Sequence, residues 1–381
     1  MIYLDNAATS WPKPPQVIQA MTDILKRGCA NPGRSAHAMA RQTEDAVLNV
    51  REAVAKFFNI KDPLRIAFMP NTTYALNAAI YGVITEGSVV ATTAMEHNSV
   101  LRPLKTLESR GIIGLETVEP DRYGRISVQS IKKVLRKGID LFCMTVSSNV
   151  TGAIMPVTEA GRICRELGIT FLVDAAQGAG VIPIDVERMN IDMLAFPGHK
   201  GLLGPQGTAG LYVREGIKIK PFIQGGTGSF SDRLFQPEVF PDILESGTLN
   251  VPGIVGLGKG ISFISETGIE HIRLKKKKLL TMLFEVLSKE ENITVFSPGP
   301  EQNSGIFAFL VHHMDSSEVS YILDRKFGIC TRSGFHCAPL AHRALGTSDS
   351  GLVRISPGYF NNETEIELTI EAIRSIARRK L

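Results

Sequence analysis

Short runs of apolar residues alternate along the chain with longer segments in which apolar residues recur at helical spacing. The runs are almost continuously hydrophobic, as in strands that are covered on both faces of a sheet. Strands that alternate with helices of this length are typical of βαβ units, so the pattern predicts an α/β fold with a mostly parallel sheet. The strand-like runs are 89–93, 140–146, 169–174, 192–196 and 208–213, and the helical segments are 36–58, 72–82, 97–110, 126–137 and 156–167.

The pattern changes near Pro252. The segment 225–253 is rich in Gly, Ser, Thr and Pro, and it is longer than an ordinary connection, which favours a functional loop. Helical patterns follow at 254–265, 268–288 and 362–379, with strand-like runs at 292–296, 305–311 and 352–356. We therefore predict a large α/β domain over residues 14–253 and a smaller α+β domain formed by residues 1–13 and 254–381.

Charge and cysteine content narrow the functional classes. The 381 residues carry 42 Lys and Arg against 38 Asp and Glu, a net charge of +4 that is too small to indicate a nucleic-acid partner. We find no spanning apolar run and no leader pattern, so we expect a cytoplasmic protein without a membrane partner. Five cysteines in so long a chain favour free thiols in a reducing compartment. We interpret the run Lys275 to Lys278 as a solvated helix face rather than an anion site.

Polar residues follow three of the strand-like runs, at the sheet edge where open α/β proteins bind ligands. Asp174 ends one run, and Asn149 lies just beyond another. Lys200 lies in a glycine-rich turn after a third run, where loss of water would make its amine a Schiff-base nucleophile. Each residue also has an ordinary interpretation, as a helix cap, a turn residue or an exposed loop lysine.

Two further elements fit a ligand site at this edge. Thr72 and Thr73 begin a helical segment, where hydroxyls and free N–H groups bind phosphate or simply cap the helix. His97 follows the run 89–93 and would stack on a flat ligand, act as an acid or base, or be structural. A lysine, a carboxylate and a phosphate-binding helix start together suggest pyridoxal 5'-phosphate, which requires all three. We find no zinc-like spacing of Cys and His and expect no metal site.

The last third of the chain adds a candidate nucleophile. Cys337 lies next to His336 and near Arg332, surroundings that favour a thiolate. We interpret the other four cysteines as packing thiols. Arg354 lies in an apolar run, and a buried arginine needs an anionic partner, either a substrate carboxylate or an internal salt bridge.

Taken in order, these motifs resemble the class V aminotransferase family of fold-type I pyridoxal-phosphate enzymes, in particular its group II cysteine desulfurase and selenocysteine lyase branch. The resemblance implies a large domain with a mostly parallel seven-stranded sheet plus a smaller α+β C-terminal domain. The matching segments are 3–9, 72–73, 96–97, 148–149, 174–177, 198–200, 245–250, 332–338 and 353–354.

The resemblance also implies roles for individual residues. Asp174 would pair with the nitrogen of the cofactor ring, Gln177 with its oxygen, and Thr248 would reach the phosphate in the partner subunit of a homodimer. Cys337 would take the sulfur of L-cysteine as a persulfide, L-alanine would leave, and an acceptor protein would receive the sulfur. The implied catalytic residues are Lys200, Cys337 and His97; the cofactor-binding residues are Thr72, Thr73, His97, Asn149, Asp174, Gln177, His199, Lys200 and Thr248; the substrate-binding residues are Asn149, Arg354, Arg332, Arg34 and His37.

The chain departs from the family pattern at three places. Pro197 stands where a phosphate-binding serine is usual, Phe335 replaces a histidine, and the segment 33–37 differs from the common Arg-Gly-x-His pattern. Selenocysteine lyase, aminotransferase, β-eliminating lyase and epimerase activities remain alternatives, as does a scaffold that binds sulfur or phosphate without catalysis.

Overall fold

The structure, a computed structural model, describes residues 1–33 and 37–378 and is built around a seven-stranded sheet within those residues. The sheet order is β2-β8-β7-β6-β5-β3-β4, and all the strands run parallel except β8, which is antiparallel to both of its neighbours. The predicted mostly parallel seven-stranded sheet is therefore confirmed. Its strands are β2 (Ile66–Met69), β3 (Ser88–Thr93), β4 (Ile113–Val118), β5 (Leu141–Thr145), β6 (Thr170–Asp174), β7 (Met193–Pro197) and β8 (Ala209–Val213).

Helices cover both faces of this sheet, which explains why its strands are apolar at successive positions. Alternate residues of one strand enter different clusters: Phe142 packs with α2, α6 and α7, whereas its neighbour Leu141 packs with α3 and α4. Helix α3 begins where the Asn71 side chain accepts the Tyr74 N–H at 2.9 Å. The helices are α1 (Pro15–Arg27), α2 (Ala38–Phe58), α3 (Thr72–Val83), α4 (Asn98–Ser109), α5 (Val128–Val134), α6 (Val157–Leu167) and α7 (Val251–Thr267).

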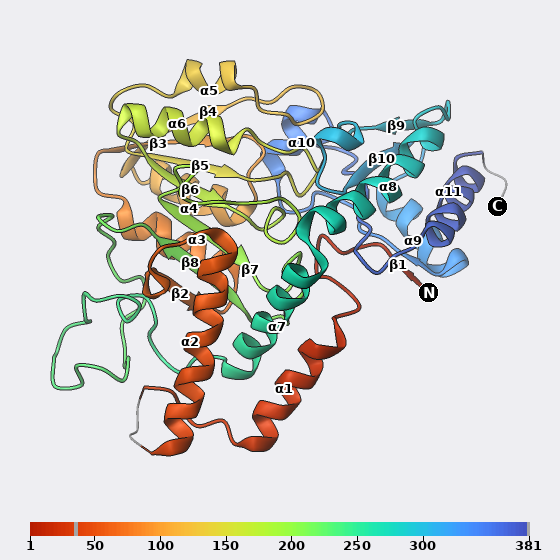
Figure 1. Cartoon of the computed structure of the whole chain (residues 1–381). Helices are drawn as coiled ribbons and strands as arrows, with labels where there is room; N and C mark the ends of the chain where they lie inside the picture. The colour runs from red at the N-terminus through yellow and green to blue at the C-terminus, as the bar shows by residue number, and fades with distance from the viewer. Residues whose placement is uncertain (34–36, 379–381) are drawn as a thin grey trace.

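A smaller α+β part follows α7 and has its own apolar cluster, which includes Leu4 from the N-terminus. Strand β1 pairs in parallel with β11, which fixes the first residues of the chain against the last third (Figure 1). The elements are β1 (Ile2–Tyr3), α8 (Ile269–Leu287), β9 (Ile293–Val295), β10 (Phe307–Val311), α9 (Ser316–Phe327), β11 (Ile329–Cys330), α10 (Pro339–Leu345), β12 (Val353–Ile355) and α11 (Glu363–Ala377). Strands β12, β10 and β9 form an antiparallel sheet.

Helix α7 connects the two parts. It lies against α1 and α2 at the lower side of the view in Figure 1, and it leads directly into α8. The proposed division into 14–253 and 1–13 with 254–381 stays a prediction. No helix within the described ranges is long and apolar enough to cross a membrane.

Most predicted elements lie where the structure has them, but two features differ. The sequence pattern does not predict β1, β2, β4, β11, α1, α9 or α10; β2, for example, is wholly apolar but only four residues long. The interpretation of Lys275 to Lys278 as a solvated face is wrong for Lys276. Its side chain is only partly exposed and lines a cavity, and this burial lowers the pKa of the Lys276 ammonium to about 8.

The long connection from β8 to α7 has no helix or strand, and a buried ion pair holds its end in place. Glu245 accepts two hydrogen bonds from the guanidinium of Arg51, at 2.9 and 3.0 Å, and a third from the Phe68 N–H at 2.5 Å. Both side chains are almost completely buried, and the Arg51 guanidinium lies 4.7 Å from the centre of the Phe68 ring. The pair thus ties the connection to α2 and β2.

Glu245→Gln is expected to lower the free energy of unfolding by about 3 kcal/mol, because it leaves the Arg51 charge buried without an opposite charge. Urea denaturation measures the change. Glu166→Gln is the control: it breaks an exposed pair with Arg162 and is expected to cost about 0.5 kcal/mol or less. Equal losses for the two variants would contradict the anchoring role of Glu245.

Candidate active site

Four strand ends meet at one cavity. Asp174 is the last residue of β6, and Lys200 follows β7 in a turn. His97 follows β3, and Asn149 follows β5. The sheet therefore brings together residues that are far apart in the sequence, as expected at the carboxyl ends of parallel strands. The sequence-predicted residues that line this central cavity are Thr72, Thr73, His97, Asn149, Asp174, Gln177, His199 and Lys200.

Lys200 and Asp174 are both removed from water. Burial lowers the pKa of Lys200 to about 8, and the negative charge of Asp174 opposes this effect. Burial likewise raises the pKa of Asp174. A hydrogen bond from the Ala176 N–H (2.8 Å) and the positive charge of Lys200 lower this pKa, but their effect is smaller than that of burial. An amine with a pKa near 8 is partly neutral at physiological pH, which is the form that attacks a carbonyl carbon.

His97 is held as a neutral ring. Burial lowers its pKa to about 4, and the charge of Lys200 adds to the effect. The ring Nδ1 accepts the Ser99 N–H at 3.1 Å, which assigns the proton of the neutral ring to Nε2. The Ser99 hydroxyl lies 2.8 Å from this Nδ1 and 2.7 Å from the Thr73 hydroxyl, so one serine links His97 to the start of α3.

Two buried polar atoms at the cavity lack a partner within the described residues: Thr72 Oγ1 and His199 Nδ1. Thr72 begins α3, where the first N–H groups have no partner inside the helix. The backbone of His199 is fixed from the opposite side, because its carbonyl accepts hydrogen bonds from Ser10 N (3.0 Å) and Lys13 Nζ (2.8 Å). These atoms form a fixed, electropositive recess that suits an anion such as phosphate.

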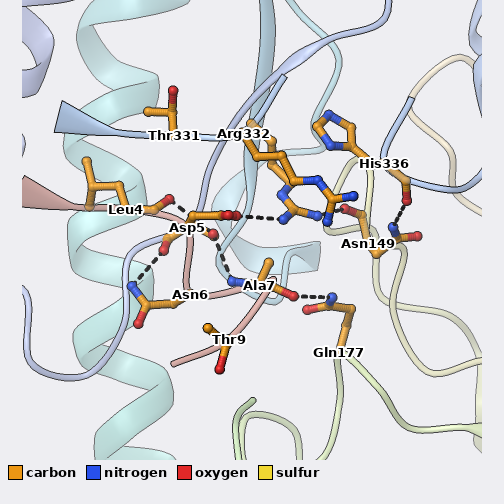
Figure 2. A network of polar contacts seen from close by, with 12 residues as sticks. Leu4, Asp5, Asn6, Ala7, Thr9, Asn149, Gln177, Thr331, Arg332 and His336 are labelled. Carbon is orange, nitrogen blue, oxygen red and sulfur yellow. Dashed lines mark hydrogen bonds and ion pairs between the residues drawn. The ribbon is translucent and has the colours of Figure 1, made fainter. Parts of the chain in front are cut away.

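Arg354 is completely buried beside the N-terminal segment. Its Nη2 donates to Asp5 Oδ1 at 2.8 Å and its Nη1 to the Asn149 carbonyl at 2.8 Å. The internal salt bridge that the sequence left open is thus present. Figure 2 shows Asp5 facing a guanidinium, with Asn149 and Gln177 at the same place. Arg354 Nε is buried without a partner in the described part of the chain, so one donor is still available for an anion.

Cys337 opens on a second, outer pocket rather than on the central cavity. The outer pocket is lined by Cys337 and Arg102 and shares Thr73, His97 and Ser99 with the central cavity. The thiol is exposed, whereas Cys143 and Cys164 are buried thiols whose pKa burial raises.

Three contacts fix the position of Cys337. Its carbonyl accepts the Asn98 N–H at 2.7 Å, and the preceding carbonyl of His336 accepts from Asn149 Nδ2 at 2.6 Å. Arg332 Nη2 lies 3.7 Å from the Cys337 sulfur, so Arg332 faces the thiol. His336 and Cys337 both have positive φ values, 47° and 58°, which non-glycine residues rarely adopt without such contacts.

The remaining predicted residues are not in the central cavity of this single chain. Thr248 is exposed and lines a separate hollow with Glu245 and Asn250. His37 caps α2, where its side chain accepts the Ala40 N–H. Arg34 lies outside the described residues.

Several residues of the site were assigned no role from the sequence, among them Ser99, Thr145 and Glu96. Ser99 and Thr145 line the central cavity, and Glu96 lies completely buried beneath it. Burial raises the pKa of Glu96 to about 8, and its Oε1 accepts from the Thr93 hydroxyl (2.7 Å) and the Thr145 N–H (3.0 Å). The sequence signal that could have identified these residues is their place in the chain. Each lies within two residues of a predicted site residue or near the end of a strand-like run.

The chain belongs to the class V aminotransferase family, whose model, Aminotransferase class-V, matches residues 2–368. Two curated archaeal relatives carry the name probable cysteine desulfurase. One, from Methanothermobacter thermautotrophicus, is 35% identical over 99% of this chain and 94% of its own length. The other, from Pyrococcus abyssi, is 33% identical over 99% of this chain and 94% of its own length. A solved apo structure of a cysteine desulfurase from Thermococcus onnurineus NA1 superposes with a TM-score of 0.93 at 32% identity, covering 99% of this chain and 95% of that one.

Asp174→Asn is expected to lower the pKa of Lys200 below its present value of about 8, because the substitution removes a negative charge that favours the ammonium form. The fraction of neutral amine at pH 7 then increases. The measurement is the pH dependence of lysine labelling at Lys200 in cofactor-free protein, read by mass spectrometry.

Lys13 provides an internal control for this labelling. Its pKa is also lowered to about 8, by burial alone, so its labelling midpoint is expected to stay unchanged in the variant. A Lys200 midpoint that rises or does not move would contradict the coupling to Asp174.

Proposed function

We propose that this protein is a pyridoxal-phosphate-dependent cysteine desulfurase that converts L-cysteine to L-alanine and takes the sulfur onto Cys337. The observation that carries the proposal is the arrangement of the two pockets. A fixed, exposed thiol opens on a pocket that shares Thr73, His97 and Ser99 with the cavity of a desolvated lysine. The names of the relatives and of the solved structure support the same activity.

The residues of the central cavity fit pyridoxal phosphate. The phosphate would be held by the start of α3 and by two unpartnered atoms, Thr72 Oγ1 and His199 Nδ1. These groups would take the place of the phosphate-binding serine that is usual in the family, where this chain has Pro197. Asp174 would pair with the ring nitrogen, and His97 would lie against the ring. When bound, the cofactor supplies an electron-withdrawing ring that stabilises negative charge on the substrate carbon.

The protein's own groups supply acid–base chemistry. Lys200, with its pKa near 8, holds or releases a proton at Nζ within the physiological range. His97 stays neutral and presents Nε2–H. The pKa of Glu96, about 8, keeps this carboxyl protonated at neutral pH, so it does not add a second negative charge beside Asp174. The cavity thus carries one carboxylate where the ring nitrogen requires it.

The substrate carboxylate would bind at Arg354 and Asn149. Arg354 has one buried donor, Nε, without a partner among the described residues. The Asn149 side-chain nitrogen is engaged with the His336 carbonyl, which links the substrate-binding residue to the loop of the nucleophile. A carboxylate placed here would be oriented by a charge-assisted hydrogen bond.

The sulfur step needs no external oxidant. The C–S bond of cysteine breaks and an S–S bond forms at Cys337, so that L-cysteine and the Cys337 thiol give L-alanine and a Cys337 persulfide. The Arg332 guanidinium, 3.7 Å from the sulfur, stabilises negative charge on the attacking thiolate. Because Cys337 is exposed, a thiol of an acceptor can reach the persulfide from the outside.

A homodimer with a composite site is part of the proposal. Thr248 is exposed and lies outside the central cavity of its own chain, where it is free to serve the cavity of a partner. The same connection between β8 and α7 exposes Leu234 (96%) and Phe235 (84%), and α1 exposes Ile18 and Leu25. Large exposed apolar side chains of this kind favour a subunit interface.

Three variants test the proposed activity with L-cysteine and a reductant. Cys337→Ala is expected to keep the yellow colour of the cofactor but to lower sulfide and alanine formation about 100-fold or more, because the sulfur acceptor is gone. Lys200→Ala is expected to lose both turnover and the lysine-dependent absorption band. Cys330→Ala is the matched control, since Cys330 lies in the same segment but outside both pockets, and it is expected to stay active. Undiminished desulfuration by Cys337→Ala would overturn the persulfide mechanism.

A further inference from the structure

A third cavity adjoins the central one on the side away from Cys337. It shares Ala176, Gln177 and Lys200 with the central cavity, and we refer to it as the inner cavity. Its far wall is formed by α8 and by the segments 304–306 and 356–360. The polar side chains on its wall are those of Asn6, Ser10, Gln177, Lys200, Lys276, Ser304, Ser356 and Tyr359.

Lys276 differs from the lysines beside it. Lys275 lies over the Tyr359 ring, Lys277 pairs with Glu301 at 2.5 Å, and Lys278 pairs with Glu363 at 2.6 Å. Lys276 has no ion pair or hydrogen bond within residues 1–33 and 37–378. The residue keeps some contact with solvent, but burial of its ammonium group lowers the pKa to about 8.

The backbone beneath Lys276 is shaped to admit its end. Gly305 has a φ of +104°, and a Cβ at this position would lie 2.5 Å from Lys276 Cε and 3.1 Å from Nζ. A side chain at residue 305 would displace the ammonium group, so the glycine lets the amine lie directly against the 304–306 segment. Gly305 thus leaves room for the end of the Lys276 side chain at the cavity wall.

The wall of the inner cavity contains two lysines and, among the described residues, no Asp or Glu. Lys200 interacts with Asp174 in the central cavity, whereas no carboxylate of residues 1–33 and 37–378 pairs with Lys276. An ammonium group that is largely removed from water is stabilised by an anion placed beside it. The cavity wall thus offers an anion a positive charge that no described carboxylate pairs with.

We propose that the inner cavity is a binding site for a small carboxylate, held by Lys276 and by hydroxyl and amide groups of the wall. The cavity volume is about 40 Å³, which holds about three water-sized groups and so admits a carboxylate but not a nucleotide or a sugar phosphate. Two kinds of molecule carry such a group: a simple carboxylate ion such as acetate, and an amino acid. The proposal is independent of the desulfurase activity, because the site is defined by Lys276 and not by Cys337.

Isothermal titration calorimetry of the purified holoenzyme with sodium acetate, at constant ionic strength, tests the proposal. Acetate is expected to occupy one site in the inner cavity of wild type, besides any binding at Arg354 and Asn149, and acetamide, its uncharged analogue, is not expected to bind there. Lys276→Met is expected to weaken acetate binding about tenfold or more, because one charge-assisted hydrogen bond is lost. Lys276→Arg keeps the charge and is expected to retain binding.

The control Lys277→Met removes a surface lysine of the same helix that pairs with Glu301, and its acetate affinity is expected to match that of wild type. Competition between L-alanine and acetate for the site dependent on Lys276 would identify the amino acid as the source, and its absence would indicate a free carboxylate. No binding by wild type, or equal binding by wild type and Lys276→Met, would overturn the proposal. Thermal unfolding of each variant verifies that it is folded.

Discussion

The site depends on one buried interaction, the ion pair of Arg354 and Asp5. Arg354 lies on β12 and Asp5 follows β1, so the pair joins residues that are 349 positions apart. The second arm of the guanidinium reaches the Asn149 carbonyl beyond β5 of the large sheet. Because both charges are largely removed from water, neither is stable without the other. The pair therefore fixes the N-terminal segment, the small sheet and the large sheet relative to one another.

The position of the nucleophile follows from this constraint. Arg332 exchanges two backbone hydrogen bonds with Arg354, so the segment that leads to Cys337 starts from the buried pair. Asn149, whose carbonyl is held by Arg354, holds the His336 carbonyl with its side chain. One guanidinium thus positions Asn149 and the segment that carries the Cys337 thiol together. The backbone strain at His336 and Cys337 is offset by the same contacts.

Sequence reasoning succeeded where one strand determines both position and chemistry. Asp174 and Lys200 follow continuous apolar runs, so the parallel-sheet rule placed them at one edge before any contact was known. It failed where the outcome depends on packing between segments. The packing of α3 against α4 brings the Thr73 hydroxyl to the Ser99 hydroxyl, and this contact places Ser99 in the site. The hydrophobic periodicity of the sequence does not predict such a contact between helices. The run Lys275 to Lys278 has the pattern of a charged face, yet the end of Lys276 lies against Gly305, which is 29 positions further along the chain. The role of Thr248 depends on a second chain and is beyond a single sequence.

The inner, central and outer cavities adjoin one another through shared residues, and the proposed sulfur acceptor, Cys337, lies in the outer one. Lys200 and Gln177 are common to the inner and central cavities, whereas Thr73, His97 and Ser99 are common to the central and outer ones. Lys276 lines the inner cavity, and the exposed thiol of Cys337 lies on the outer side with Arg102. Since that sulfur is accessible from solvent, an acceptor can remove it without entering the cavity where the charges are desolvated. The low polarity that sets the pKa of Lys200 is thereby preserved while sulfur leaves the protein.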